Sequence, residues 1–231
     1  DLVEAGATVI LEADPRLVAL FRRSFAGIEC IVKQDPPTAE TRRDGIDFQS
    51  PGGNLGRWLR PNLESFPGRQ SYLVAEEDRQ GRLRENYLSD GESLLVGVAW
   101  GSKNKRIGAQ KSMTLMELAP LTGIPGVRFI DLQYGDTAEE RRQFEDHTGV
   151  TVLHDEHVDQ MSDLDAFAAQ VAAMDLVISV SNTTVHMSGA LGVPTWVMLN
   201  TVPLPCWLLE RDDSPWYPSV RLFRQSAGGA W

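Results

Sequence analysis

The sequence predicts an α/β protein built on parallel sheets. Short apolar runs rich in β-branched residues alternate with segments of helix length along most of the 231 residues. The clearest unit spans residues 175–199, where apolar runs at Leu176–Val180 and 193–199 flank one such segment. A strand, a helix and a strand in this order form a βαβ unit, whose two strands run parallel in one sheet.

The first residues of the chain predict another βαβ unit. Asp14 is suited to cap a helix, and Pro15 suits its first turn. Residues 1–6 resemble a helix end with Gly6 as its stop. We therefore expect the chain to begin inside a Rossmann-like domain, after the first strand and glycine-rich turn of that domain. The expected elements are a strand at 7–12, a helix at 15–25 and a strand at Ile28–Val32.

Residues 33–56 are rich in Pro, Gly, Asp and Thr, a composition typical of irregular structure. One short strand is expected at 46–49. Residues 51–56 contain two glycines close together, as dinucleotide-binding loops do, but no strand of good length precedes them and no clear helix follows. We therefore expect a loop at 51–56.

A strongly charged run at 76–85 predicts a solvated helix that connects two domains, and Ser89, Asp90 and Gly91 predict a turn after it. We therefore place a domain boundary there. Residues 1–89 are expected to form a partial N-terminal Rossmann-like domain, and residues 90–231 a C-terminal Rossmann-like domain. Residues 206–231 are expected to pack back on the first domain.

Regular alternation of strands and helices is predicted after the boundary. Either Ser112 or Thr114 is suited to cap the first helix. Because each predicted strand is followed by a helix, the turns that leave the strands lie at one edge of the sheet, where open α/β folds bind ligands. The expected elements are strands at 94–100, 127–133 and 150–154, and helices ending at Leu121 and spanning 137–147 and 163–173.

The turn after Leu176–Val180 is the main candidate for a ligand site. It consists of Ser181, Asn182, Thr183 and Thr184, which open a helix whose free N–H groups and positive dipole end favour a phosphate. His186 lies one turn further and can face the same edge. The alternatives are that the turn residues only cap the helix, and that His186 is a half-buried histidine bonded to backbone.

A second candidate follows the strand at 94–100, which ends at Trp100. The loop after it concentrates positive charge in an acidic chain, and we interpret it as a cationic loop that neutralises a diphosphate. The alternative is an ordinary exposed loop. Gln133 and Tyr134 end the next strand, and Tyr134 offers its ring to a base or ribose, unless it is simply a surface aromatic. The basic residues of the cationic loop are Lys103, Lys105, Arg106 and Lys111.

Composition excludes several classes of function. A net charge of −10 argues against nucleic acid as a partner. No apolar run is long enough to span a membrane, no signal peptide is evident, and Cys30 and Cys206 are too few for a disulfide framework, so we expect a cytoplasmic protein. Neither the acidic and histidine residues at 154–157 nor the Asp-Leu-Asp at 163–165 has the context of a metal site. We expect no metal and no cofactor.

Two stretches resemble a known family. They read SNTTVHMSGALG followed by PTWVML, and WLLERDDSPWYPSVRLFRQ. This pattern resembles the C-terminal region of bacterial tetratricopeptide-repeat glycosyltransferases and, more distantly, the ADP-heptose:lipopolysaccharide heptosyltransferases. The resemblance implies the GT-B fold, with two facing Rossmann-like domains and a nucleotide-sugar donor held mainly by the second. It also implies helical repeats upstream and places Met161 near the nucleobase. Heptosyltransferases usually have an aspartate at the position of Ser181 and commonly a glycine at that of Thr183, so the donor sugar stays open.

The function that the resemblance implies is transfer of a sugar from a UDP- or ADP-sugar to an acceptor that the sequence does not identify. The implied route is metal-independent and inverting. Lys105, Arg106, the turn at 181–184 and His186 would offset the charge that develops on the departing diphosphate. The general base is expected in the first domain and is not assigned. Two alternatives stay open: a non-catalytic nucleotide-sugar-binding or scaffold module of a repeat protein, and a nucleotide-sugar epimerase or hydrolase.

Overall fold

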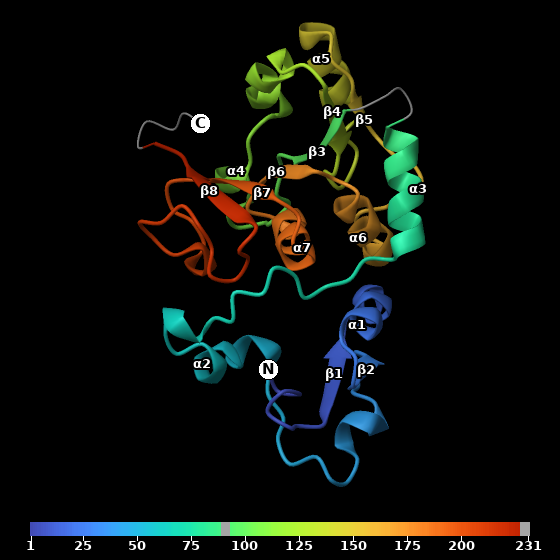
Figure 1. The fold of residues 1–231 in the computed structure, drawn as a ribbon, viewed down its shortest axis with the longest axis vertical. Helices are drawn as coiled ribbons and strands as arrows, with labels where there is room; N and C mark the ends of the chain where they lie inside the picture. Colours follow the sequence, from blue (N-terminus) through green and yellow to red (C-terminus); the bar gives the residue numbers. More distant parts are fainter. Residues whose placement is uncertain (89–92, 227–231) are drawn as a thin grey trace.

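The computed structural model describes residues 1–88 and 93–226 and contains two parallel sheets, one of two strands and one of six (Figure 1). The predicted α/β class and parallel sheets are confirmed. The predicted turn at 89–91, with the boundary inside it, and the last residues of the tail, 227–231, lie outside the described residues. The division into two domains stays a prediction.

The small sheet is the predicted N-terminal βαβ unit. Asp14 accepts a hydrogen bond from the backbone N–H of Arg16 and so caps the first helical turn. Ala13, Val18 and Cys30 are buried together between the sheet and the helix. The unit consists of β1 (Val9–Ala13), η1 (Pro15–Leu17), α1 (Val18–Ser24) and β2 (Ile28–Val32), and the two strands pair in parallel.

The segment between β2 and residue 76 differs from the prediction. The expected strand at 46–49 is wrong: these residues have no regular structure, and the Phe48 side chain is 94% exposed. A strand needs a neighbour to satisfy its backbone groups, and no described strand lies beside this segment. Part of the loop expected at 51–56 is helical. The short helices of the segment are η2 (Ala39–Arg42), η3 (Gly52–Asn54), α2 (Gly56–Leu59) and η4 (Leu63–Ser65).

The charged run at 76–85 forms helix α3 (Glu77–Tyr87), as predicted. The Glu76 side chain caps it by accepting hydrogen bonds from the backbone N–H groups of Asp78 and Arg79. Leu83 and Tyr87 are its buried residues, and they join the largest apolar core of the protein. The helix is therefore solvated on one side and packed on the other.

The six strands of the large sheet are all parallel and lie in the order β5-β4-β3-β6-β7-β8. The chain moves outward from β3 to β5, then crosses to the other side of β3 and moves outward again from β6. The strand order therefore reverses between β3 and β6, and such a switch point is where doubly wound sheets bind ligands. The strands are β3 (Leu94–Ala99), β4 (Val127–Asp131), β5 (Val152–Leu153), β6 (Leu176–Val180), β7 (Thr195–Leu199) and β8 (Val220–Arg224).

Helices cover both faces of the large sheet (Figure 1). Phe167 of α6 and Met187 of α7 pack on one face together with α3, and Leu118 of η5 and Phe144 of α5 pack on the other. Pro120 lies inside η5, and the segment is a 3-10 helix. The elements are α4 (Gly108–Lys111), η5 (Leu115–Gly123), α5 (Ala138–Thr148), α6 (Leu164–Ala172), α7 (Thr183–Leu191) and η6 (Pro205–Trp207).

The tail supplies strand β8, which the sequence did not predict. Val220 and Leu222 of this strand are buried against β7 with Trp207. Between η6 and β8, Trp216 meets the ring of Phe66 edge-on at 4.7 Å. A cavity of about 290 Å³ lies beside this contact and is lined by residues from both ends of the chain.

The small sheet and the large sheet are joined by a few specific contacts. The Arg16 guanidinium donates to the carbonyl of Met161 over 2.7 Å, and Arg23 forms an ion pair with Asp165 of α6. The backbone N–H groups of Tyr72 and Leu73 donate to the last turn of α7. None of the described helices is long and apolar enough to cross a membrane.

Candidate functional site

The candidate site lies at the switch point, where the loop after β3 meets the turn after β6. Two side chains tie these segments together. The Asn182 amide donates to the carbonyl of Gly101 over 3.1 Å, and the Lys111 ammonium donates to the carbonyl of Ser181 over 2.6 Å. The two loops therefore form one structure at the carboxyl edge of the sheet.

Lys111 is the most unusual residue of this edge, because its side chain is charged and yet only 7% exposed. Burial lowers the pKa of its ammonium group. Ser181 is its only hydrogen-bond acceptor in the described structure, although an ammonium has three donors. The sequence placed Lys111 in the cationic loop but not among the site residues, because its burial depends on packing.

Asn182 is the N-cap of α7. Its side-chain oxygen accepts from the backbone N–H of Thr184 at 2.9 Å and from the Ser179 hydroxyl at 3.1 Å. Asn182 therefore caps the helix, as the alternative interpretation expected, and its amide also holds Gly101. Its part in ligand binding stays a prediction. Thr183 is exposed at the start of the helix, whereas the Thr184 hydroxyl is buried without a hydrogen-bond partner in the described part of the chain.

Ser181 and His186 belong to a buried aromatic cluster with the tail. The Trp207 indole donates to the Ser181 hydroxyl over 2.8 Å. The His186 ring stacks on Trp207, with centroids 5.3 Å apart and planes at 14°, and its Nδ1 lies 3.0 Å from the Tyr217 hydroxyl. Burial and the nearby charge of Lys111 lower the pKa of His186, so the imidazole is neutral at neutral pH.

The cationic loop is held by its backbone and leaves its charges exposed. The Asn104 side chain accepts from the N–H groups of Arg106 and Ile107 at 3.0 and 3.2 Å, which closes a local turn. Lys105 and Arg106 are exposed, and within residues 1–88 and 93–226 their side chains form no hydrogen bond or ion pair. The loop closes tightly, since a Cβ on Gly108 would lie 2.3 Å from the carbonyl oxygen of Ser102.

The loop also contacts the end of the neighbouring strand. The Lys103 backbone N–H donates to the Tyr134 hydroxyl over 2.7 Å, and the Lys103 ammonium lies 5.6 Å from the centre of the Tyr134 ring. This distance is within the range of a cation–π interaction. Tyr134 and the cationic loop therefore lie together at the carboxyl edge of the large sheet.

Trp100 and Gln133 are buried residues at the ends of β3 and β4, and they hold the backbone of the site in place. The Trp100 side chain is 2% exposed and its indole donates to Glu140 over 3.0 Å. Gln133 is also buried, and its side-chain oxygen accepts from the backbone N–H groups of Trp100 and Gly101 at 3.1 and 2.7 Å. These two residues hold the backbone at the end of β3 in place, and their polar groups are already used in these hydrogen bonds.

Asp131, at the end of β4, connects Gln133 to the residues that follow β5. It is fully buried and accepts from the Gln133 N–H at 2.8 Å, the Thr137 hydroxyl at 2.5 Å and His154 at 2.9 Å, with Arg141 at 3.3 Å. Burial raises the pKa of Asp131, and the hydrogen bonds from Thr137, Gln133 and His154 oppose the rise. Asp131 was not predicted as a site residue, since it ends an apolar strand without a motif.

Met161 lies apart from these contacts, on the loop between β5 and α6. Its side chain is 50% exposed, and its carbonyl accepts the hydrogen bond from Arg16. The acidic residues after it have structural partners: Asp163 caps α6, and Asp165 pairs with Arg23. Within the described residues, no group of three or more His, Cys, Asp or Glu side chains is placed to hold a metal ion.

Comparison with known proteins finds one curated relative by sequence and solved structures that share the fold. No family model matches the chain. The chain is 32% identical over 248 residues to Protein FlbA of Caulobacter vibrioides, an alignment that includes the whole chain and 41% of that protein. The chain therefore spans about two fifths of the length of this curated relative.

Two solved structures share the fold. A glycosyl transferase of family 9 from Veillonella parvula superposes with a TM-score of 0.51 over 68% of this chain and 43% of its own. ADP-heptose lps heptosyltransferase II of E. coli superposes with a TM-score of 0.52 over 74% of this chain and 51% of its own. Both are 14% identical in sequence, so the likeness establishes the fold alone. The predicted resemblance to heptosyltransferases is confirmed at that level, and the association with tetratricopeptide repeats stays a prediction.

Proposed function

We propose that this chain carries the donor-binding part of a glycosyltransferase, which transfers a sugar from a UDP- or ADP-sugar to an acceptor. The observation that carries the proposal is the switch point itself. There the N-terminus of α7 and the loop of Lys105 and Arg106, whose side chains have no partner among the described residues, are tied together at the carboxyl edge of the sheet. Glycosyltransferases with the same fold support the reaction class.

The chemistry needs positive charge where a diphosphate departs. As the bond from the anomeric carbon to the diphosphate oxygen breaks, negative charge grows on the phosphates, and preorganised donors lower the barrier. Lys105, Arg106, Lys111 and the N–H group of Thr183 are suited to this task. The route would need no metal ion, and a base of the first domain would remove the acceptor proton as the anomeric carbon inverts. That base is not assigned.

The site residues differ in the part they would play. Lys105, Arg106 and Thr183 are exposed and would contact phosphate directly, and Tyr134 and Met161 would lie toward the ribose and base. His186 is neutral and already bonded to Tyr217, so it would add a hydrogen bond rather than a charge. Trp100, Gln133, Ser181 and Asn182 would hold the geometry.

The wider organisation is part of the proposal. Residues 1–89 would form the acceptor side and residues 90–231 the donor side, with the contact between Arg16 and Met161 joining them. Helical repeats upstream in a longer chain, as the family resemblance implies, would belong to the same protein.

Calorimetric titration tests donor binding by the chain. UDP, ADP and GDP, each with and without a sugar, are titrated into wild type, Lys111→Met and the control Arg142→Gln. Arg142 is an exposed residue of α5 that pairs with Glu139. We expect one nucleotide series to bind, more weakly in Lys111→Met, and the control to match wild type. No binding of any nucleotide at millimolar concentration would refute the proposal.

One observation favours the non-catalytic module as a second candidate. The Ser181 hydroxyl is occupied by Trp207 in a buried contact, so this position does not face a donor sugar. Incubation with the bound nucleotide-sugar separates the possibilities. Transfer to an added acceptor supports the transferase, whereas conversion of the nucleotide-sugar alone indicates an epimerase or hydrolase. Binding without any conversion favours the module.

A further inference from the structure

A second polar cluster lies at the carboxyl ends of β4 and β5, outside the switch-point loops. Nδ1 of His154 lies 2.9 Å and Nε of Arg141 lies 3.3 Å from the same oxygen of Asp131, which is fully buried. His154 directly follows β5, and Arg141 lies near the start of α5, where its Nε also donates to the Thr137 hydroxyl over 3.1 Å. Because both side chains are held at one oxygen atom, they lie next to each other.

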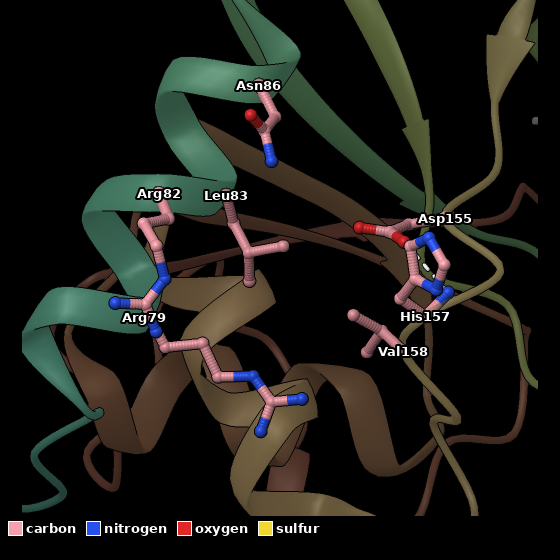
Figure 2. Close-up of a pocket in the computed structure, with 7 residues that line it drawn as sticks. All are labelled: Arg79, Arg82, Leu83, Asn86, Asp155, His157 and Val158. Atoms are coloured by element: carbon pink, nitrogen blue, oxygen red, sulfur yellow. Dashed lines mark hydrogen bonds between the residues drawn. The ribbon is translucent and has the colours of Figure 1, made fainter.

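His154 faces the α5 side of the sheet, whereas the residue after it faces α3. Asp155 accepts from the Tyr87 hydroxyl of α3, and Figure 2 shows it across from that helix, beside a cavity of about 210 Å³. The two arginines of that cavity, Arg79 and Arg82, already have ion-pair partners, so the cavity offers little to a ligand. The cluster around Asp131 is separate from it.

His154 and Arg141 each keep one end free. The terminal nitrogens of Arg141 and Nε2 of His154 have no hydrogen-bond partner in the part of the chain that the structure describes, and the side chains are 23% and 24% exposed. Asp131 accepts from the Gln133 N–H and the Thr137 hydroxyl and lies beside the Arg141 cation, so it is an acceptor and Nδ1 of His154 carries the proton. In the neutral ring Nε2 is then an acceptor, next to the donors of Arg141.

This pair suits a neutral group that presents a hydrogen-bond donor beside an acceptor. The charge of Arg141 is offset by Asp131, and Glu139 and Glu140 stand in the first turn of α5, so a phosphate would be disfavoured there. The edges of nucleobases carry N–H donors next to carbonyl or ring-nitrogen acceptors. The chemistry of the pair therefore fits a base.

The position along the sheet fits the same ligand. β5 lies two strands from β3, about 10 Å at the usual strand spacing, so a nucleotide with its diphosphate at the switch point has to extend along the edge to reach it. On the β7 side the tail packs on the turn, since Trp207 is fully buried and bonded to Ser181. On the other side the half-buried Tyr134 follows β4, the strand between β3 and β5.

We propose that His154 and Arg141 bind the base of the nucleotide-sugar donor by its hydrogen-bonding edge and so determine which base is accepted. This assignment rests on the proposed function. Nε2 of His154 accepts from an N–H of the base, and Arg141 donates to the adjacent carbonyl oxygen or ring nitrogen. Asp131 is a positioning residue, which fixes the tautomer of His154 and the place of Arg141 without contacting the ligand.

Calorimetric titration of the full chain with UDP, CDP, ADP, GDP and pyrophosphate tests the assignment, because pyrophosphate has the phosphates without a base. We expect wild type to bind its preferred nucleotide at least about tenfold more tightly than the least favoured one. His154→Phe keeps a ring without the acceptor, and Arg141→Lys keeps the charge beside Asp131 without the guanidinium. Both should reduce the preference to about threefold or less and leave pyrophosphate affinity unchanged, and the control Arg142→Gln should match wild type.

Nitrogen NMR of His154 gives a readout that a purely structural residue would not give. The Nε2 resonance should shift when the preferred nucleotide is added and stay in place when pyrophosphate is added. Nδ1 should stay protonated in both cases, because Asp131 holds its proton.

Several results would overturn the proposal. Equal affinity of wild type for the four nucleotides would show that no base is recognised, and an unchanged preference in both variants would place the base elsewhere. An equal loss of affinity for nucleotides and pyrophosphate would show that the cluster only supports the fold. An Nε2 resonance that no nucleotide moves would exclude the contact. These results leave the proposed function standing, whereas failure of all five ligands to bind would refute both.

Discussion

Lys111 and the pair Lys105 and Arg106 represent two ways of placing positive charge at a ligand edge. Lys111 is buried and bonded to Ser181, so its position is fixed before a ligand arrives, whereas the other two are exposed and must be ordered on binding. Preorganised charge acts without a cost in reorganisation, while exposed charge is screened by salt. The two kinds of cation should therefore respond differently to ionic strength.

The exposed pair gives the first prediction. Changing Lys105 and Arg106 together to alanine should weaken binding of a nucleoside diphosphate by about 1.5 to 3 kcal/mol, the range for hydrogen bonds to charged groups. The free energy of unfolding should barely change, because neither side chain has a described partner. Titration of the diphosphate and of the matching nucleoside measures the effect. An equal loss for both ligands would mean that the loop does not bind phosphate.

His186 gives a prediction on stability and pH. Its pKa is lowered in the folded protein, so the unfolded state binds the proton more readily. The stability due to its neutral form is therefore complete above about pH 6.5 and is lost as the pH falls from there through the folded-state pKa. The slope for one proton is at most about 1.4 kcal/mol per pH unit.

Urea unfolding between pH 5 and 8 measures this slope. His186→Gln should flatten the acid side of the curve, and the control His147→Gln should not, because His147 is an exposed residue of α5. Parallel curves for wild type and His186→Gln would mean that His186 does not contribute to the acid sensitivity.

At the scale of elements, the strands and helices around the switch point were predictable from the sequence. The strand content of residues 46–49 and of the tail was not. The bounds of β6, Leu176–Val180, are those predicted, because an apolar run with turn residues behind it specifies a buried strand. The strand at 46–49 failed because strand formation depends on a neighbour, which no local pattern reveals. Strand β8 was missed since its residues were interpreted only as a packing tail.

The same reason explains which site residues were found. The turn at 181–184 and the loop with Lys105 were recognised because their residue types and positions after strands carry the signal. Asp131 and Lys111 were not assigned to the site, because their importance comes from burial among distant segments. A charged residue at the end of an apolar strand, such as Asp131, is the signal that could have been used.

The turn after β6 supports a prediction at this scale. Asn182→Ala removes the cap of α7 and the bond to Gly101, and should cost about 1 to 2 kcal/mol of stability. Asn182→Asp keeps the capping oxygen but loses the donor to Gly101 and adds a negative charge at the proposed phosphate site. It should therefore retain most of the stability and lose nucleotide affinity. Thermal unfolding and titration of both variants provide the measurement, and an Asp variant with unchanged affinity would contradict the placement of phosphate there.

At the scale of the whole molecule, the segment at 70–73 links the small-sheet part to the large sheet by packing on the end of α7. Tyr72 and Leu73 both donate backbone N–H groups to the carbonyl of Ala190, at 2.9 and 3.0 Å. The Tyr72 ring also stacks on Tyr217 of the tail, with centroids 6.1 Å apart. Since His186 bonds to Tyr217, this segment is connected through the tail to the switch point.

Gly192 is the residue that permits this close approach. It ends α7 in the left-handed region, with φ at +77°, and a Cβ there would lie 2.6 Å from the carbonyl oxygen of Gln70. Gly192→Ala should therefore cost about 1 to 3 kcal/mol, from the strained backbone and the displaced segment together. The amides of Tyr72 and Leu73 should lose protection from hydrogen exchange before the strands of the large sheet do. Gly123→Ala is the matched control, because its Cβ would have no neighbour within 4 Å. If both variants keep full protection at 72 and 73, the contact with α7 does not hold the segment.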